Sequence, residues 1–177
     1  NGNLGATWTG SPTFEPFDTT GWLSGPTGVG YDRATAYDSL IGVDVGGPMR
    51  SNTSVYIRID FDVNDSASVD QLELRIKYDD GFVAFLNGEQ LASANSPASL
   101  RWNSSARVAH GANPRAYIKF DVSDKKGNLR TGRNVLAIQG LNDTVNSSDM
   151  LIVPELYAGR VSAPTTLEPR INFGAIE

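Results

Sequence analysis

The sequence predicts an all-β fold, a sandwich or a barrel. Short segments in which apolar and polar residues alternate are separated by turn residues, and long helical patterns are missing. Glycine and proline are plentiful, at 18 and 9 residues. The length of 177 residues suits one domain with a sizeable core.

The clearest strands are expected at 54–63 and 70–78. Both segments alternate with a period of two, which is typical of a strand with one buried face. The outward face of 54–63 would carry Tyr56, Arg58, Asp60 and Asp62. The residues expected to point inward are Val55, Ile57, Ile59, Phe61 and Val63 in the first segment and Leu72, Leu74, Ile76 and Tyr78 in the second.

A strand covered on both faces is expected at 82–86, because FVAFL is apolar throughout. Asn87-Gly88 follows and predicts a two-residue hairpin, since both residue types tolerate positive φ. The return strand is expected at about 89–94 and a long loop at 95–114.

The last strands are expected at 115–122, 134–141 and 150–157, with a polar turn at 123–133. Pro154 predicts a bulge or a sheet edge, because proline cannot donate to the ladder. One face of the first of these strands would hold Ala116, Ile118, Phe120 and Val122. The segment 24–53 is rich in glycine and is expected to be mostly loop.

The long connections should gather at one end of the molecule if consecutive strands alternate in direction. These connections are 24–53, 79–81, 95–114 and 142–149. Because function usually lies on loops held by a rigid scaffold, we expect the site at this end. The alternative place is the outward face of 54–63, with Tyr56, Arg58, Asp60 and Asp62.

The stretch KYDDGFVAFL places two acids side by side. We interpret Asp79-Asp80-Gly81 as a tight turn between two paired strands, because Asp-Gly is a preferred turn dipeptide. If the carboxylates do more, they would bind sugar hydroxyls or calcium, which takes oxygen ligands. The candidate calcium ligands are Asp79, Asp80 and Asp32, with further oxygens from Asn142 and Asp149.

The composition argues against several functions. The chain has no cysteine, which excludes thiol catalysis and cysteine-based zinc sites. A net charge of −5 without a basic stripe disfavours nucleic acids and anionic membranes. His110, the one histidine, is expected in an exposed loop, and no Gly-x-Ser-x-Gly turn accompanies it. No carboxylate pair is marked as a glycosidase acid and base, so we expect no enzyme.

Trp102 is the best candidate for a sugar-stacking residue, since it stands beside Asn103, Ser104 and Arg107 in LRWNSSARV. The alternative is that it plugs the end of the sandwich. Trp8 and Trp22 are expected in the core. Tyr37 and Tyr31 are weaker candidates, and Tyr31 could be a core residue. The candidate carbohydrate-binding residues are Trp102, Asn103, Arg107, Tyr37, Tyr31, Asn142, Asn146 and Asp149.

Several motifs occur in a fixed order: FEPFDTTGW, GVGYD, YIRIDFDV, YDDGFVAFLNGEQLASANSP, WNSSA, LRTGRNVLAIQGLN and SSDMLIVPEL. This order resembles the galactose-binding-like β-sandwich (jelly-roll) modules of large secreted bacterial proteins of the planctomycete type, which stand beside lamin-tail, CotH-like or hydrolase domains. Two of the motifs also resemble the sugar-binding jelly roll of family 2 glycoside hydrolases. The resemblance covers about residues 7–157.

The resemblance implies a non-catalytic carbohydrate-binding module of a secreted or cell-surface protein. Related modules also serve as spacers or interaction domains, which is the alternative. It further implies a monomer whose partners are a polysaccharide and neighbouring domains of the same chain. The module would span 1–158. Residues 159–177 would form a linker and the start of a lamin-tail-like domain, which PRINFGAIE resembles.

Overall fold

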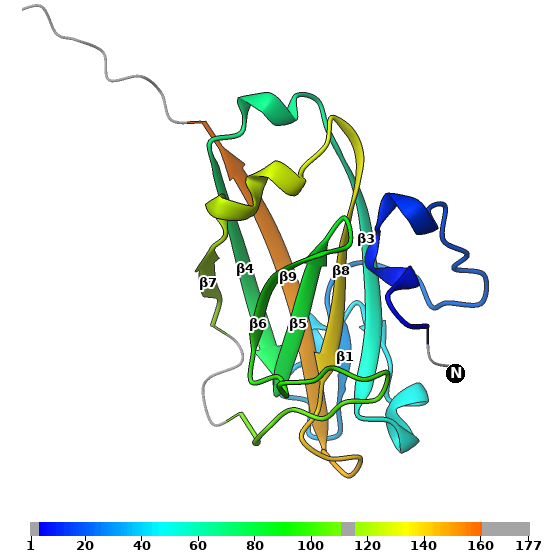
Figure 1. Ribbon diagram of the computed structural model, residues 1–177. Helices are drawn as coiled ribbons and strands as arrows, with labels where there is room; N and C mark the ends of the chain where they lie inside the picture. Colours follow the sequence, from blue (N-terminus) through cyan, green and yellow to red (C-terminus); the bar gives the residue numbers. More distant parts are fainter. Residues whose placement is uncertain (1–3, 111–115, 161–177) are drawn as a thin grey trace, which may run out of the picture.

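The computed structural model describes residues 4–110 and 116–160. Its strands form two sheets packed face to face, one with the order β2-β1-β9-β4-β7 and one with the order β3-β8-β5-β6 (Figure 1). The expected all-β sandwich is therefore confirmed. The strands are β1 Val29–Asp32, β2 Val43–Asp44, β3 Ser54–Val63, β4 Gln71–Asp79, β5 Gly81–Leu86, β6 Glu89–Ala94, β7 Ile118–Asp121, β8 Gly132–Leu141 and β9 Asp149–Gly159.

Short 3-10 turns connect these strands. No helix among the described residues has the length and apolar character needed to cross a membrane. The expected linker and lamin-tail-like start lie mostly beyond residue 160, outside the described part. The 3-10 turns are η1 Thr7–Thr9, η2 Pro12–Phe14, η3 Asp38–Leu40, η4 Pro48–Ser51, η5 Ser66–Ser68 and η6 Ser123–Asn128.

The core lies between the two sheets and follows the period-two pattern. Leu72, Leu74 and Ile76 of β4 are at most 1% exposed. The predicted inward residues of β3 pack against the same cluster, with Ile57 fully buried and its neighbours on that face partly buried. The expected inward faces of both strands are confirmed, because each alternation has one apolar side to bury.

The connection between β4 and β5 differs from the expected hairpin turn. β4 pairs with β7 and β9, whereas β5 pairs with β6 and β8, so Asp79-Asp80-Gly81 crosses from one sheet to the other. Alternation within a strand says which face is buried and leaves its pairing partner undecided. The hairpin expected at Asn87-Gly88 is confirmed, with φ values of 52° and 97° at these residues.

The strands from β3 to β9 alternate in direction although most connections change sheet. Figure 1 shows the corner at 79–81, the loop after β6 and the loop before β9 at the same end of the sandwich. Grouping the long connections at one end was therefore correct. The reason is that crossing to the facing sheet reverses the chain as a hairpin does.

The segment 24–53 contains two strands that the sequence pattern did not predict. β1 joins the edge of β9, and β2 pairs with β1 in parallel. Gly30 permits the close approach, because a Cβ there would lie 2.2 Å from the Met150 carbonyl oxygen. Pro154 causes no bulge, since the register between β4 and β9 is continuous. The pairing of β1 with β9 ends at Ile152, so the side of β9 that faces β1 is a sheet edge at Pro154.

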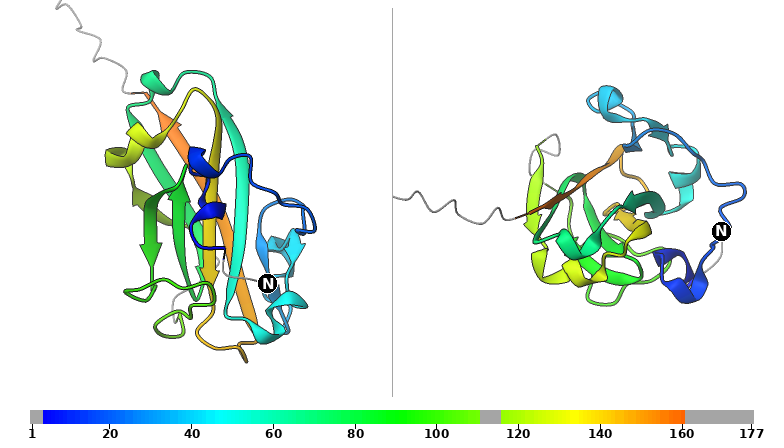
Figure 2. Two further views of the ribbon diagram at one scale, coloured as in Figure 1. Left: turned by 45° about the vertical axis from the view of Figure 1, so that its right-hand side comes forward. Right: turned by 90° about the horizontal axis from the view of Figure 1, so that it is seen from above.

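The N-terminal segment covers the outer face of the four-stranded sheet (Figure 2). Trp8 is 2% exposed, as expected for a core residue, and its ring centroid lies 4.5 Å from that of Tyr56. Arg58 forms a 2.7 Å ion pair with Glu15 under this cover. This cover explains the two apolar faces of β5. On the outward face of β3 it leaves Tyr56 and Arg58 half-buried, while Asp60 and Asp62 are exposed.

Gly30→Ala should destabilise the fold by about 1–3 kcal/mol, because the added methyl group collides with backbone that cannot move aside. Gly127→Ala is the control, since a Cβ there meets nothing within 4 Å. Urea unfolding of both variants measures the difference. Equal stability of the two variants would show that β1 does not pack this closely.

Candidate functional site

Asp80 lies at the end of the sandwich where the connections 79–81, 95–114 and 142–149 gather (Figure 1), which we call the loop end. Its side-chain oxygens accept the backbone N–H of His110 at 2.7 Å and that of Asp143 at 2.8 Å. Its carbonyl accepts from the Asn95 side chain at 3.0 Å, and its own N–H donates to the Leu141 carbonyl at 3.1 Å. One residue thus holds three segments that are far apart in sequence.

Asp79 adds a fourth segment to this corner. Its Oδ2 accepts the Tyr37 hydroxyl at 2.8 Å. Burial, together with the neighbouring Asp80 carboxyl group, raises the pKa of Asp79 to about 7. Burial and the bond to Asp79 raise the pKa of Tyr37 as well.

The three candidate calcium ligands do not form a group. Asp32 accepts the backbone N–H of Ala34 at 2.6 Å and of Tyr37 at 2.7 Å, which stabilises its own loop. Within 4–110 and 116–160, no three His, Cys, Asp or Glu residues are placed to hold a metal ion. Asp79, Asp80 and Asp32 are therefore not identified as metal ligands by this geometry, and a calcium ion stays a prediction from sequence.

Three of the expected sugar-binding residues are internal, which corrects their assignment to an accessible site. Tyr31 and Tyr37 are 7% exposed and Asn142 is fully buried. The Tyr31 hydroxyl donates to the Ser147 carbonyl and accepts from the Asn142 side chain, both at 2.9 Å. The two tyrosine hydroxyls and Nδ2 of Asn142 join segments of this end to one another, while Oδ1 of Asn142 is buried without a hydrogen-bond partner.

Four other candidates have different surroundings. Arg107 and Asn146 are exposed, and Asp149 is half-buried with weak contacts to Ser147 and Ser148. Asn103 is half-buried, and its Oδ1 accepts the backbone N–H of Thr53 at 2.8 Å. Nothing gathers this group into one surface.

His110 is half-buried, which corrects the expectation of an exposed loop histidine. Its ring stacks on Tyr78 with centroids 4.6 Å apart, and its Nδ1 is buried without a hydrogen-bond partner. The stacking helps to hold the loop after β6 against β4.

Trp102 is exposed while the backbone around it is fixed. The side chain is 43% exposed, which excludes its role as an end plug. Its carbonyl accepts the Tyr56 hydroxyl at 2.6 Å. The preceding carbonyl, that of Arg101, accepts Nε2 of the buried Gln139 at 2.8 Å. The Ser104 carbonyl accepts the Ser54 hydroxyl at 2.7 Å.

These bonds attach the Trp102 segment to rigid strands. Gln139 lies near the C-terminal end of β8, and Ser54 and Tyr56 belong to β3. A tryptophan that is exposed and yet held this closely is preorganised to meet a ligand.

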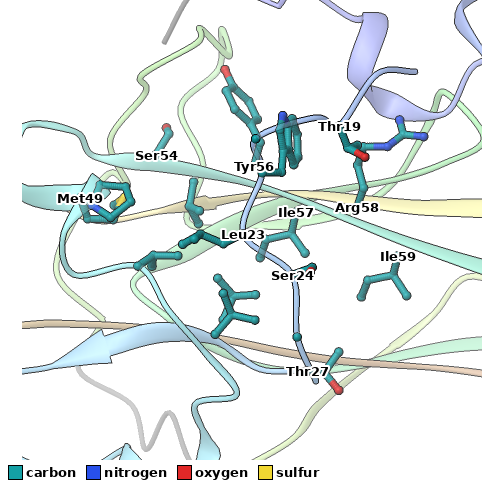
Figure 3. Close-up of a pocket in the computed structure, with 18 of the residues that line it drawn as sticks. Thr19, Leu23, Ser24, Thr27, Met49, Ser54, Tyr56, Ile57, Arg58 and Ile59 are labelled. Atoms are coloured by element: carbon teal, nitrogen blue, oxygen red, sulfur yellow. The ribbon is translucent and has the colours of Figure 1, made fainter. Parts of the chain in front are cut away.

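A groove of about 700 Å³ follows β3 beside Trp102. Figure 3 shows Tyr56 and Arg58 on one side of β3 and Ile57 and Ile59 on the other, with the segment that carries Leu23 and Ser24 running past them. The volume is in the range of ligand sites, about 300–1,000 Å³. The groove includes Tyr56, Arg58 and Asp60 of the outward face that the sequence offered as the alternative site. The pattern did not show which other segments complete the groove, because they are far apart in the chain.

Trp22 also lines the groove, whereas the sequence placed it in the core. It is half-buried and packs edge-on against Phe17, with ring centroids 5.8 Å apart. Its neighbour Leu23 is 60% exposed. In TGWLSG the tryptophan and leucine stand between turn residues and not in an alternating strand, and this pattern could have indicated that the segment lies outside the sandwich.

The charged residues of the groove are already paired. Arg58 bonds Glu15, and Asp60 accepts from Arg133 at 2.9 Å. The remaining lining is apolar, aromatic or neutral and polar. A second hollow, of about 780 Å³ near β1, is lined mainly by charged residues such as Asp38, Asp44 and Arg50. Its one aromatic lining residue, Tyr31, is only 7% exposed.

No protein-family model and no curated protein matches the chain. Similar solved structures include an α-L-rhamnosidase of Streptomyces avermitilis in complex with L-rhamnose (17% identity, TM-score 0.41, 62% of this chain and 9% of that one). A family GH78 rhamnosidase of Bacillus sp. GL1 (27%, 0.39, 60% and 10%) and the exo-chitosanase CsxA of Amycolatopsis orientalis (18%, 0.41, 84% and 18%) are also similar. The chain thus spans less than a fifth of each enzyme.

Asn103→Ala should destabilise the fold by about 1–3 kcal/mol, because it leaves the buried backbone N–H groups of Thr53 and Ser54 without their acceptor. Asn146→Ala, at an exposed position, should change stability by less than about 0.5 kcal/mol. Chemical denaturation of both variants gives the comparison. A similar effect of the two would show that Asn103 does not anchor the Trp102 segment.

Proposed function

We propose that this chain is a non-catalytic carbohydrate-binding module whose ligand lies against Trp102 in the β3 groove. The observation that carries the proposal is an exposed indole on a backbone that is fixed by hydrogen bonds from Tyr56, Ser54 and Gln139. Flat aromatic faces suit the apolar C–H face of a sugar ring, and neighbouring polar groups suit its hydroxyls. A backbone that is already fixed loses little freedom on binding, which favours affinity.

The groove favours an uncharged sugar. Its two charged side chains, Arg58 and Asp60, are neutralised by Glu15 and Arg133. Asn52 and Thr19 offer neutral hydrogen-bonding groups in the same lining. An acidic sugar would find no free cation among these lining residues.

A binding role is also more consistent with the carboxylates than hydrolysis is. Glycosidases need two carboxyl groups that reach the scissile bond. Asp79 and Asp80 are 7% and 6% exposed, and their oxygens contact the protein's own groups. Asp60 is the one carboxylate that lines the groove in the described part of the chain. We therefore assign this chain the attachment of a secreted multidomain protein to a polysaccharide.

A protein-interaction module is the second candidate, and the free edge of β3 favours it. The carbonyls of Val135 and Leu141 in β8 accept from residues on the β5 side. These two β8 residues bond toward β5, so their β3 partners, Asp60 and Ser54, direct their main-chain N–H and C=O groups away from β8, toward the sheet edge. The alternation along β3 gives Tyr56 and Arg58 the same direction. Such an edge can add an extended peptide strand.

Trp102→Ala should weaken binding to a neutral polysaccharide by about tenfold or more, which corresponds to about 1.4 kcal/mol. Phe14→Ala is the matched control, since both side chains are 43% exposed and Phe14 does not line the groove. Affinity electrophoresis across a panel of neutral and acidic polysaccharides measures the effect. Equal retardation of the two variants, or binding of peptides in place of any glycan, contradicts the proposal.

A further inference from the structure

Two tyrosines on the outer face of the five-stranded sheet share one carboxylate. Glu155 of β9 accepts the Tyr117 hydroxyl at 2.7 Å and the Tyr157 hydroxyl at 2.9 Å, one at each side-chain oxygen. Tyr117 stands directly before β7, and β4 separates β7 from β9 in the sheet (Figure 1). Because the Tyr117 side chain reaches toward β9 across a whole strand, it lies along the sheet surface and not upright on it.

Each tyrosine ring is also in contact with a cation of β4. The guanidinium carbon of Arg75 lies 3.9 Å from the centroid of the Tyr157 ring, and Nζ of Lys77 lies 4.5 Å from that of Tyr117. Since Tyr157 is 45% exposed, Arg75 covers one face of its ring and the other face meets solvent. We call these four residues, with Lys119 opposite Arg75 in β7, the tyrosine face.

The contacts of Tyr157 hold its ring in one position. Its hydroxyl is bonded to Glu155, and one ring face rests on Arg75. A side chain that is oriented before a ligand arrives loses little freedom on binding. The solvent-exposed face of such a ring suits the apolar C–H face of a sugar.

The carboxylates of this part of the sheet are already engaged. Glu155 accepts both tyrosine hydroxyls, and these hydrogen bonds lower its pKa, which keeps it ionised. Glu73 forms an ion pair with Arg75. Asp121 accepts the backbone N–H of Ser123 at 3.0 Å and its hydroxyl at 2.6 Å. The negative charges of this surface are therefore bonded to the protein's own groups.

Two lysines of the tyrosine face have no carboxylate partner. Neither Lys77 nor Lys119 forms an ion pair with a residue of 4–110 or 116–160, and Lys119 is exposed. The face of an aromatic ring carries partial negative charge, which repels an anion, but a cation on the opposite side of the ring offsets this repulsion. On a chain of net charge −5, this surface therefore favours a sugar that carries a negative charge.

We propose that the tyrosine face is a second carbohydrate-binding site and that its ligand is an acidic polysaccharide. The sugar rings lie on Tyr157, and the carboxylates of the uronate residues pair with Lys119 and Lys77. The site belongs to the sheet opposite that of β3, so it does not depend on the groove beside Trp102. The charged side chains of the groove are paired within the protein, whereas this face offers lysines to a ligand.

The test uses oligosaccharides of polygalacturonate, alginate and glucuronoxylan together with their methyl esters, which keep the sugar rings and lose the charge. Calorimetry should show binding of at least one acidic oligosaccharide, with its ester bound about tenfold more weakly. Raising the NaCl concentration should weaken binding of the acid, because screening acts on the ion pairs. Amide NMR signals of Arg75, Lys119 and Tyr157 should shift on addition of the acid, while that of Trp102 should not.

Tyr157→Ala should weaken binding of the acidic oligosaccharide about tenfold, and Lys119→Gln should weaken it about threefold. Phe14→Ala is the matched control for the ring, since Phe14 is 43% exposed, and Arg130→Gln, an exposed cation that precedes β8 in the other sheet, is the control for the charge. Both controls should bind as the parent chain does.

Binding that Tyr157→Ala leaves unchanged overturns the proposal, because attraction by charge alone would then explain it. Equal affinity for the acid and its ester, or no binding of any of the three acids, also contradicts it. If the acid shifts the signal of Trp102 and not that of Tyr157, the ligand lies in the β3 groove and the tyrosine face is not a site.

Discussion

The hydrogen bonds of Asp80 are the constraint on which the loop end depends. A β-sandwich places its connections at two ends, and long connections need partners for their buried backbone groups. Here one carboxylate accepts N–H groups from two loops, and the adjacent carboxylate binds Tyr37 of a third. The loops are thereby joined to the point where the chain passes between the sheets, so loop order and sheet packing are coupled.

The Trp102 segment is organised separately from this corner. Gln139 and Ser54, both in the four-stranded sheet, hold the carbonyls on either side of the tryptophan. Fixing the backbone from below leaves the indole free to face the groove. The same domain therefore combines a loop end held by buried acids with an exposed aromatic ring whose backbone is held by neutral amide and hydroxyl groups.

The strands were predictable because their signal is local. Alternation in β3 and β4 states which side chains point inward, and Asn87-Gly88 states where a hairpin turns. The candidate site was predicted less well. Trp102 does line a groove, but Tyr31, Tyr37 and Asn142 are internal. A polar residue in a loop has the same sequence signal whether it faces solvent or another loop, so its burial could not be inferred.

The sequence by itself determined an all-β domain, its main strands and their inward faces, because a period of two requires one apolar side to be buried. Only the tertiary structure decided that Asp79-Asp80 crosses between sheets. It also decided that Tyr37 meets Asp79, 42 residues away, and that the groove forms beside β3. Pairing of strands and contacts between loops depend on segments far apart in the chain, and no local pattern of residues encodes them.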